Sequence, residues 1–580
     1  MKLRSARWFD GGDEVALSHR VALRLTEADR GRPVIGIADT SSALNPCNAG
    51  LADLVAEVER GIRDGGGLPA RFPVMSLGED LMKPTAMLYR NLVAMELEET
   101  VRANPIDGVV FLANCDKSVP AALLAAASTD IPSLLLIGGS RAAPAYAGKP
   151  LGSGTDLWRA LDERRTGRMD ERQWQELEST LRCAGPGACN TMGTASSMAI
   201  VTELLGMCLP GSAGVPAGGA RLQQIAWETG RLVAEHVRRE WTPTQRITQA
   251  AWDNAVRGLA AVGGSTNAVI HLAAVAGRLG LAGDLTRMDR LWRDVPLLAD
   301  VEPCGARLVA AFAAAGGVPA LVRAMGPLVD GGTVAGDGRS WAQVAAAGGA
   351  GAAASSQGST TPAGVIRSLD DPVRAAPTLA AVFGSLAPDG AVVKVAAATP
   401  QLLQHRGRAV VFDDYDAMRA RLDDPAAGIE AGDVVIVRGC GPKGAPGMPE
   451  WGMAPIPKRL LARGVPDMLR ITDGRMSGTS FGTVVLHVAP EAAAGGPLGR
   501  VAEGDTVELD LAGRRLDLLV DPEQLATRTF PQPAAAAHLR GWPRLYADHV
   551  QQAPQGADLD FLAGPTEAAR RFIEPTVGRS

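Results

Sequence analysis

The feature that most constrains this chain is the alternation of short apolar runs with longer amphipathic stretches in its first part. The runs at 33–38, 108–112 and 133–137 are rich in valine, isoleucine and leucine, and they predict strands. Amphipathic stretches near 50–64 and 84–103 predict helices. Strands that are separated by helices are typical of an α/β fold, in which the strands pair in parallel. We therefore predict a parallel sheet with helices packed against it.

The rest of the sequence divides into a helical part and a β-rich part. From about 156 to 330 the pattern is mostly helical, with predicted helices at 170–182, 193–207, 219–239, 245–260 and 266–279. Residues 345–361 lose both periodicity and aromatic residues, which predicts a domain junction between 345 and 375. Short β-rich runs follow, at 391–397, 408–413, 433–438, 467–472, 483–488, 505–511 and 515–520.

These patterns predict the fold class α/β with two domains. Residues 1–360 would form an N-terminal α/β domain with a parallel sheet and many helices. Residues 361–580 would form a C-terminal β-barrel-like domain with flanking helices, because evenly spaced short strands are typical of a compact barrel. The last two β-rich runs are joined by a short turn that contains Gly513, which predicts a hairpin.

The composition excludes several classes of protein. The chain carries 58 basic and 63 acidic residues, a net charge of −5 that is too even to indicate a nucleic-acid partner. With 46% apolar residues and no uninterrupted apolar stretch of membrane-spanning length, no membrane association is expected. The first residues lack the apolar segment of a secretory signal, so we expect a cytoplasmic protein.

Three of the seven cysteines stand in turns rich in glycine, proline or asparagine: Cys47, Cys115 and Cys189. The set is odd in number and lacks CxxC spacing, which argues against a disulfide scaffold or a zinc ribbon. The three turns lie far apart in the sequence, so only the tertiary structure could gather them. Gathered thiolates would suit an iron–sulfur cluster, and three protein ligands would leave one iron open to substrate. Ordinary buried thiols are the alternative.

Carboxylates accompany these cysteines. Asp116 and Lys117 directly follow Cys115, Glu79 follows an apolar run, and Glu450 stands in a proline-rich turn of the second domain. Carboxylate oxygens favour a hard cation such as Mg²⁺, whereas a surface Asp–Lys pair is the plainer alternative. Only seven of the 58 basic residues are lysine, and lysine, unlike arginine, can lose its proton and be modified. A lysine in this segment therefore suggests a specific role.

Two further segments present hydroxyl groups. Residues 473–480 contain Ser477 and Thr479 next to glycines, and such a turn can present a serine to a ligand or be merely structural. Residues 263–267, Gly-Gly-Ser-Thr-Asn, open a predicted helix and could bind an anion through backbone N–H groups or act as a cap. They lack the pattern of a nucleotide-binding loop.

Taken together, these motifs resemble the dihydroxy-acid and sugar-acid dehydratase family over nearly the whole chain. Segments 76–79, 84–92 and 153–158 look like the sugar-acid branch, which acts on aldonates, and do not resemble the enzyme of branched-chain amino-acid synthesis. Two positions depart from the family pattern: Cys304 stands where serine is expected, and Gly474 stands where alanine is usual. The resemblance implies a homodimer or homotetramer.

The resemblance also implies a ligand set and a reaction. An iron–sulfur cluster, 2Fe–2S in preference to 4Fe–4S, would be held by Cys47, Cys115 and Cys189. The Mg²⁺ ligands would be Glu79, Asp116, Glu450 and a carbamylated Lys117. Ser477 would be the catalytic base, with Thr479 as a substrate contact.

The expected reaction is the dehydration of a pentonate or hexonate to a 2-keto-3-deoxy acid. Removal of the C2 hydrogen is opposed by the neighbouring carboxylate, so Mg²⁺ on that carboxylate and on the C2 hydroxyl would help. Iron would act as Lewis acid for the C3 hydroxyl, and a serine base would need strong activation. The alternatives are a dihydroxy-acid dehydratase of branched-chain amino-acid synthesis, an enzyme for a phosphorylated aldonate, and a non-catalytic iron–sulfur sensor or binding protein.

Overall fold

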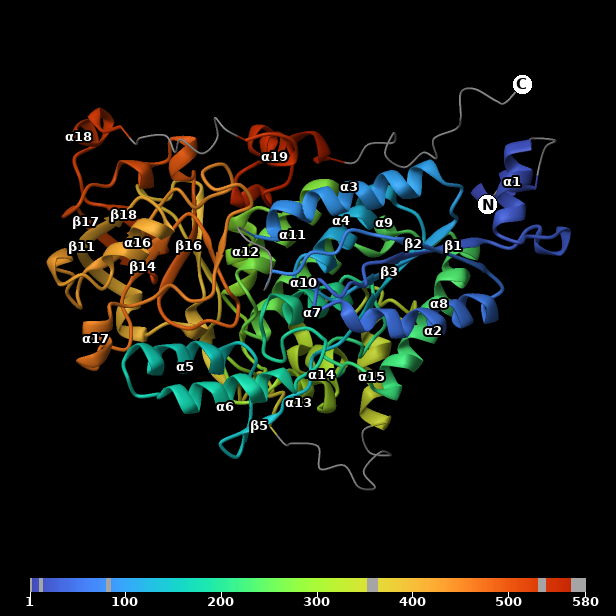
Figure 1. Ribbon diagram of the computed structural model, residues 1–580, viewed down its shortest axis with the longest axis horizontal. Coiled ribbons are helices and arrows are strands. Elements are labelled where there is room, and N and C mark those ends of the chain that lie inside the picture. Colours follow the sequence, from blue (N-terminus) through green and yellow to red (C-terminus); the bar gives the residue numbers. More distant parts are fainter. Residues whose placement is uncertain (1–2, 10–13, 80–84, 352–363, 530–538, 565–580) are drawn as a thin grey trace.

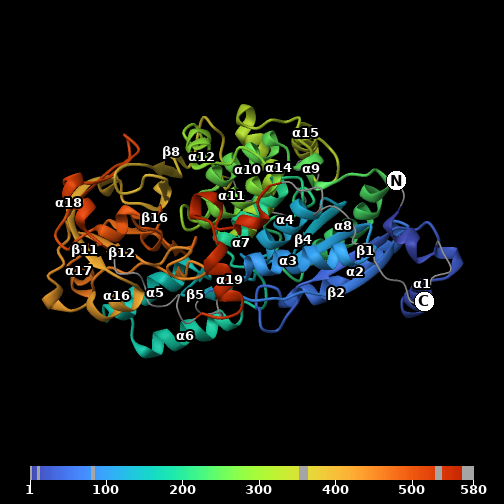
Figure 2. The same cartoon turned by 90° about the horizontal axis from the view of Figure 1, so that it is seen from above.

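A computed structural model describes residues 3–9, 14–79, 85–351, 364–529 and 539–564 (Figure 1). The N-terminal parallel sheet and the C-terminal sheet lie at opposite ends of the molecule, and helices fill the space between and around them (Figures 1 and 2). The domain boundary predicted at 360/361 lies outside the described residues. No helix in the described ranges is long and apolar enough to cross a membrane.

The N-terminal sheet has four parallel strands in the order β2-β1-β3-β4. Their bounds are β1 Val34–Asp39, β2 Leu68–Pro73, β3 Gly108–Ala113 and β4 Ser133–Ile137. The prediction of a parallel sheet is confirmed. Strand β2 was not predicted, because two prolines and partly exposed side chains give it the pattern of a loop, and a strand with prolines is tolerated at a sheet edge.

Alternate side chains of the strands face two different helical layers. Ile35, Val110 and Leu134 pack with helices α2 (Val55–Asp64) and α8 (Ala220–Arg238). Val109, Phe111 and Leu135 pack on the other face with α3 (Met87–Ala103) and α4 (Ser118–Thr129). The apolar runs are continuous because parallel strands in such a sandwich are buried on both faces.

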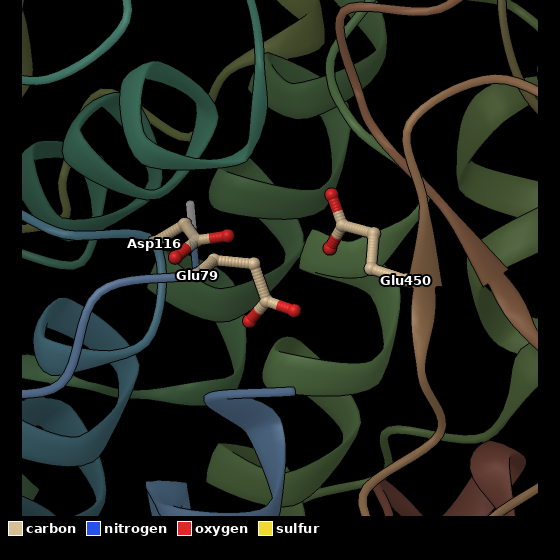
Figure 3. A group of neighbouring side chains, drawn as sticks. All are labelled: Glu79, Asp116 and Glu450. Carbon is tan, nitrogen blue, oxygen red and sulfur yellow. The ribbon is translucent and has the colours of Figure 1, made fainter. Parts of the chain in front are cut away.

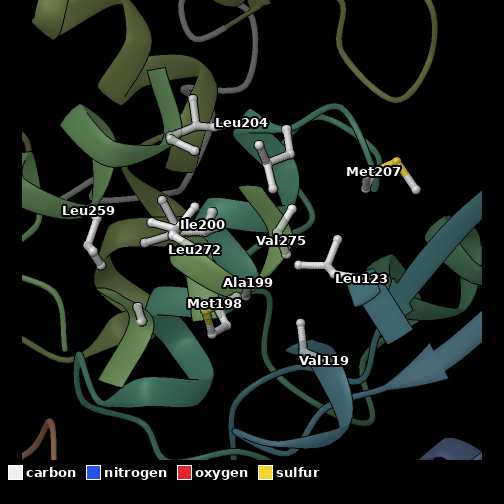
Figure 4. Close-up of a cluster of buried hydrophobic side chains, with 14 of the residues drawn as sticks. Val119, Leu123, Met198, Ala199, Ile200, Leu204, Met207, Leu259, Leu272 and Val275 are labelled. Carbon is white, nitrogen blue, oxygen red and sulfur yellow. The ribbon is translucent and has the colours of Figure 1, made fainter. Parts of the chain in front are cut away.

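A helical core extends from α4 toward the middle of the molecule. Helices α7 (Thr194–Leu204), α10 (Gln249–Ala261) and α11 (Asn267–Leu279) contribute Ile200, Leu259 and Leu272 to one buried cluster with Val119 and Leu123 of α4 (Figure 4). This cluster fixes the first turns of α7 and α11, which reach the candidate site.

Shorter elements complete the N-terminal part. The remaining helices are α1 Glu14–Ala22, α5 Thr155–Arg165, α6 Glu171–Arg182, α9 Pro243–Arg246, α12 Leu285–Trp292, α13 Val309–Ala314, α14 Gly317–Met325 and α15 Trp341–Gly351. The small strands are β5 Ala145–Tyr146, β6 Lys149–Pro150 and β7 Pro296–Leu297, and β7 pairs with β8 Arg374–Pro377. Helix α15 continues past 345 into the stretch where the sequence loses its periodicity and where the domain junction was predicted, since alanine has a high helix propensity even without an amphipathic pattern.

The C-terminal sheet has eight strands in the order β18-β17-β11-β12-β14-β16-β10-β9. Their bounds are β9 Ala380–Val382, β10 Gly390–Val393, β11 Gln404–Phe412, β12 Val434–Val437, β14 Arg470–Thr472, β16 Val484–Ala489, β17 Thr506–Asp510 and β18 Arg515–Leu518. Backbone hydrogen bonds of 2.9 Å from Phe383 to Arg514 and from Leu516 to Phe383 bring the two edges together. The sheet is therefore nearly closed into a barrel, as predicted, with four antiparallel and three parallel strand pairings.

Three helices flank this barrel, α16 Tyr415–Arg421, α17 Lys458–Ala462 and α18 Pro522–Thr527. The predicted hairpin is present as β17 and β18, which pair antiparallel. Two short strands, β13 Glu450–Trp451 and β15 Arg475–Met476, pair in parallel outside the main sheet.

The end of the described chain returns to the N-terminal helices. Helix α19 (Trp542–His549) lies beside α3 in both views, and the Trp542 indole donates a 2.8 Å hydrogen bond to the Leu88 carbonyl (Figures 1 and 2). Further along, Arg278 of α11 binds Asp558 at 2.8 Å, and both side chains are buried. The last described segment of the predicted C-terminal domain therefore packs on helices of the N-terminal part.

Candidate active site

The carboxyl edge of the parallel sheet gathers the loops of three cysteines: Cys47, Cys115 and Cys189. Cys47 follows β1 and Cys115 follows β3, and the ends of parallel strands meet at one edge of a sheet. The Asn48 side-chain oxygen accepts a 2.8 Å hydrogen bond from the Cys115 backbone N–H. A 3.1 Å backbone hydrogen bond joins Gly187 to Pro46. The Cys47 loop thus contacts the loops of both other cysteines.

The seven thiols differ in how deeply they are buried. Cys115 is buried with its Sγ 3.1 Å from Asp116 Oδ1, whereas Cys47 and Cys189 are partly exposed at the same edge. Cys208 and Cys440 are enclosed elsewhere, and burial raises the pKa of both thiols, which disfavours the thiolate that a metal needs. Cys183 is exposed on the surface, and Cys304 is partly exposed.

The three carboxylates that were singled out in the sequence come together from both halves of the chain. Oxygen atoms of Glu79, Asp116 and Glu450 lie within 4.8 Å of one another (Figure 3). Thr85 Oγ1 donates to Glu79 Oε1 at 2.7 Å, and Asn267 Nδ2 donates to Glu450 Oε2 at 2.8 Å. Three positioned carboxylates are the donor set that suits a hard divalent cation.

Lys117 lies among these carboxylates and is almost fully buried. Its Nζ is 2.6 Å from Asp116 Oδ2, 3.5 Å from Glu79 Oε2 and 3.7 Å from Glu450 Oε2. Burial alone would lower the pKa of Lys117, but the three carboxylates outweigh it and raise the pKa. Burial raises the pKa of Glu450, whereas Lys117 outweighs burial at Asp116 and lowers the pKa of that carboxyl.

The turn with Ser477 and Thr479 directly follows strand β15. The Ser477 backbone N–H donates to the Trp451 carbonyl at 2.8 Å, next to Glu450 on the paired strand β13. The Ser477 and Thr479 hydroxyl oxygens are 3.0 Å apart, and Trp158 of α5 donates its indole N–H to Thr479 Oγ1 at 2.8 Å. The turn is therefore held between β13 and α5, beside the carboxylate group.

Arg475 connects the two halves of this site, although no role was predicted for it. Its guanidinium is fully buried, donates to the Met448 carbonyl at 2.7 Å and to Thr85 Oγ1 at 2.8 Å, and pairs with Glu450. A surface arginine and a buried one look alike in a sequence rich in arginine. The only indication in the sequence that Arg475 takes part in the site was its position inside the 473–480 motif.

Residues 263–267 contribute side chains to the site. Asn267, the first residue of α11, holds Glu450, and Ser265 Oγ is 2.9 Å from Thr194 Oγ1 at the start of α7. Ser265 also lies against Gly478, where an added Cβ would come within 2.5 Å of it. Gly478 is therefore needed for the close packing of the Ser477 turn.

Two family models together match most of the chain. Residues 32–344 match the family model described as dihydroxy-acid/6-phosphogluconate dehydratase, N-terminal, and residues 364–557 match its C-terminal counterpart. The chain belongs to the dihydroxy-acid/6-phosphogluconate dehydratase family. It is therefore an enzyme of the hydro-lyase class.

Named members of this dehydratase family resemble the chain along almost its full length. It is 42% identical to the 6-deoxy-6-sulfo-D-gluconate dehydratase of Pseudomonas putida, over 99% of this chain and 98% of the relative. It is 44% identical to the L-arabonate dehydratase of Azospirillum brasilense, over 97% of each chain. A dihydroxy-acid dehydratase from a Roseiflexus species is 36% identical over 96% of this chain and 99% of its own length.

Replacement of Arg475 should destabilise this dehydratase strongly. Arg475→Met leaves the buried Glu450 carboxylate without its guanidinium partner, and removal of one partner from a buried pair costs about 3–5 kcal/mol. The control is Arg182→Met, because Arg182 is 70% exposed in its pair with Glu178 and an exposed pair is worth about 0–1 kcal/mol. Thermal unfolding of both variants checks the difference, and equal midpoints would contradict it.

Proposed function

We propose that this dehydratase converts a sugar acid, a pentonate or hexonate aldonate, to a 2-keto-3-deoxy acid. The observation that carries the proposal is the convergence of oxygen ligands, cysteine loops and the Ser477 turn from both halves of the chain. The relatives named L-arabonate and 6-deoxy-6-sulfo-D-gluconate dehydratase support a sugar acid as substrate.

The oxygen-rich group fits a magnesium ion. Glu79, Asp116 and Glu450 would hold Mg²⁺ with a carbamylated Lys117, whose Nζ is 2.6–3.7 Å from the three carboxylates. When bound there, Mg²⁺ would supply positive charge to the substrate carboxylate and the C2 hydroxyl. The carbamate would add one more oxygen ligand at a position where lysine, but not arginine, can react.

The cysteine loops fit an iron–sulfur cluster. Cys47, Cys115 and Cys189 would hold it, and we favour a 2Fe–2S cluster with three protein ligands. The bound cluster would supply a Lewis acid for the departing C3 hydroxyl. The 3.1 Å distance between Asp116 Oδ1 and Cys115 Sγ supports this pairing of Mg²⁺ and cluster ligands, because the two groups would act on adjacent hydroxyl groups of one substrate.

The proposed base is Ser477. Its alkoxide would accept the C2 proton and become a hydroxyl, while the electron pair of the C2–H bond forms the C2–C3 double bond and the C3 hydroxyl leaves. Thr479 touches the Ser477 hydroxyl and is held by Trp158, so it can orient both the base and a substrate hydroxyl. The resulting enol would tautomerise to the keto acid.

The surroundings of Thr479 favour a polyhydroxy chain over a branched alkyl chain. Trp158 of α5 binds Thr479, Arg159 lies over the ring of Phe481, and Glu302 lies 3.8 Å from Arg159. The Glu302 Oε2 atom is buried without a hydrogen-bond partner among the described residues. A hydroxyl-rich substrate can satisfy such groups, whereas the two methyl groups on C3 of dihydroxyisovalerate cannot. Dihydroxy-acid dehydration is therefore the second candidate.

The assay that tests this function uses anaerobically purified enzyme, a panel of pentonates and hexonates, and dihydroxyisovalerate. We expect 2-keto product from an aldonate, with kcat/KM higher than for dihydroxyisovalerate. Ser477→Ala should keep cluster and Mg²⁺ but lose about 10²–10⁴-fold in kcat, the share of general-base catalysis. A clear preference for dihydroxyisovalerate would replace the proposal by the second candidate, and absence of any product would favour a binding protein.

Only three cysteines should be needed for the cluster. Serine at position 47, 115 or 189 should remove visible absorption and iron, because each change removes a soft ligand. Cys440→Ser serves as the buried control and Cys183→Ser as the exposed control, and both should keep the cluster. An intact cluster without Cys115 would overturn this assignment, as would a cluster that is lost from the exposed control.

Lys117 should act as a carbamate and not as a cation. Lys117→Arg keeps the positive charge but cannot form the carbamate, so Mg²⁺ affinity and turnover should both fall at least tenfold. Calorimetric Mg²⁺ titration measures the first, and a ¹³C carbamate signal after incubation of the parent enzyme with ¹³C-bicarbonate identifies the modification. Near-parent turnover of Lys117→Arg would mean that the residue serves only as an ion-pair partner.

A further inference from the structure

Lys394 is a buried cation outside the ligand groups described above. It follows strand β10, its side chain is buried, and its Nζ donates a 2.9 Å hydrogen bond to the Gly478 carbonyl. It forms no ion pair with any residue that the structure describes. Burial lowers the pKa of Lys394, and the nearby Cys304 opposes this shift. An ammonium group without a carboxylate partner is costly in a protein interior, which calls for a compensating role.

The hydrogen bond from Lys394 ends on one particular peptide unit. The Gly478 carbonyl and the Thr479 N–H belong to the same peptide group, and this N–H points to Ser477 Oγ at 3.4 Å. A cation on the carbonyl oxygen polarises the peptide and makes its N–H a stronger donor. The two hydrogen bonds therefore connect Lys394 to Ser477 Oγ, the oxygen atom that is the base in the proposed function.

The packing of the turn holds this arrangement in place. Gly478 has no room for a side chain, because an added Cβ would lie 2.5 Å from Ser265 Oγ and 3.1 Å from the Thr194 backbone nitrogen. The Thr479 carbonyl is held by Thr155 of α5 at 3.2 Å. The peptide between Gly478 and Thr479 is thus fixed on both sides, so a charge at Lys394 acts on it in one orientation.

We propose that Lys394 is a positioning residue that activates Ser477 through the Gly478–Thr479 peptide. Its ammonium group fixes the peptide and strengthens the N–H donor that stabilises the Ser477 alkoxide. The proposal rests on the proposed role of Ser477 as base. In that reaction the alkoxide takes the C2 proton, and the positive charge of Lys394 is unchanged throughout, as expected of a group that acts by its field.

Other charged groups near the turn must be separated from Lys394 in any test. Cys304 faces the lysine, Arg475 lies two residues before Ser477, and Glu450 is on the paired strand β13. Of these, Cys304 can be replaced without touching the proposed ligands. Cys304→Ser in the parent background therefore shows how much of the pH dependence comes from its thiol.

The test compares the pH dependence of kcat in Lys394→Met, Lys394→Gln and the matched control Lys458→Met, an exposed lysine of α17. Glutamine can donate to the Gly478 carbonyl but carries no charge. We expect both Lys394 variants to keep iron and Mg²⁺. Their ascending pH limb should move up by about one unit, with about tenfold lower kcat at neutral pH and recovery at higher pH. Lys458→Met and Cys304→Ser should keep the parent profile.

Two results would overturn the proposal. A parent-like pH profile in both Lys394 variants, or full recovery by glutamine alone, would reduce Lys394 to a structural hydrogen-bond donor. Loss of iron and Mg²⁺ from both variants would likewise assign it a purely structural role.

Ser477→Ala distinguishes failure of the base from failure of Lys394. Exchange of the substrate C2 hydrogen with solvent deuterium should stop in Ser477→Ala. Near-parent exchange in that variant would reject Ser477 as base, and with it the role of Lys394, whereas the sugar-acid substrate is tested separately by the substrate panel. If exchange stops while the Lys394 variants behave like the parent, only the role of Lys394 fails.

Discussion

The site depends on one balance of buried charge. Glu79, Asp116 and Glu450 bring three negative charges into a region where water is scarce, and Lys117 and Arg475 compensate part of that charge. Carboxylates so close together repel one another unless cations lie between them. Since Glu450 comes from the C-terminal half and Asp116 from the N-terminal half, the same ion pairs that stabilise the carboxylates also hold the halves together.

The architecture could be predicted from the sequence where burial requires a recognisable pattern of apolar residues. Strands β1, β3 and β4 are apolar throughout because both faces of the sheet are covered, and they were identified within one or two residues. The edge strand β2 carries prolines and partly exposed side chains, so its pattern is that of a loop. Helix α5 was missed as a helix, because little of it is buried and its sequence has no apolar stripe.

The candidate site divides in the same way. The loops of Cys47 and Cys115 and the acid Asp116 stand out because unusual residue types occur in turns, and the resemblance to a family supplied their expected roles. Arg475 and Lys394 were not predicted to act in the site, because nothing in the neighbouring sequence distinguishes a buried cation from a surface one. Their partners, Glu450 and the Gly478 carbonyl, are known only once the chain is folded.

The order of synthesis matters for this fold, because its last described segment packs on helices of the N-terminal part. All three cysteine loops and two of the carboxylates belong to the part that leaves the ribosome first, whereas Glu450 and Ser477 follow much later. The contacts of Arg278 with Asp558 and of Trp542 with the Leu88 carbonyl form only when synthesis is nearly finished. An early fragment therefore holds Asp116 and Lys117 without Glu450 and Arg475, and these buried charges reach their full set of partners only when the second half of the chain has been made.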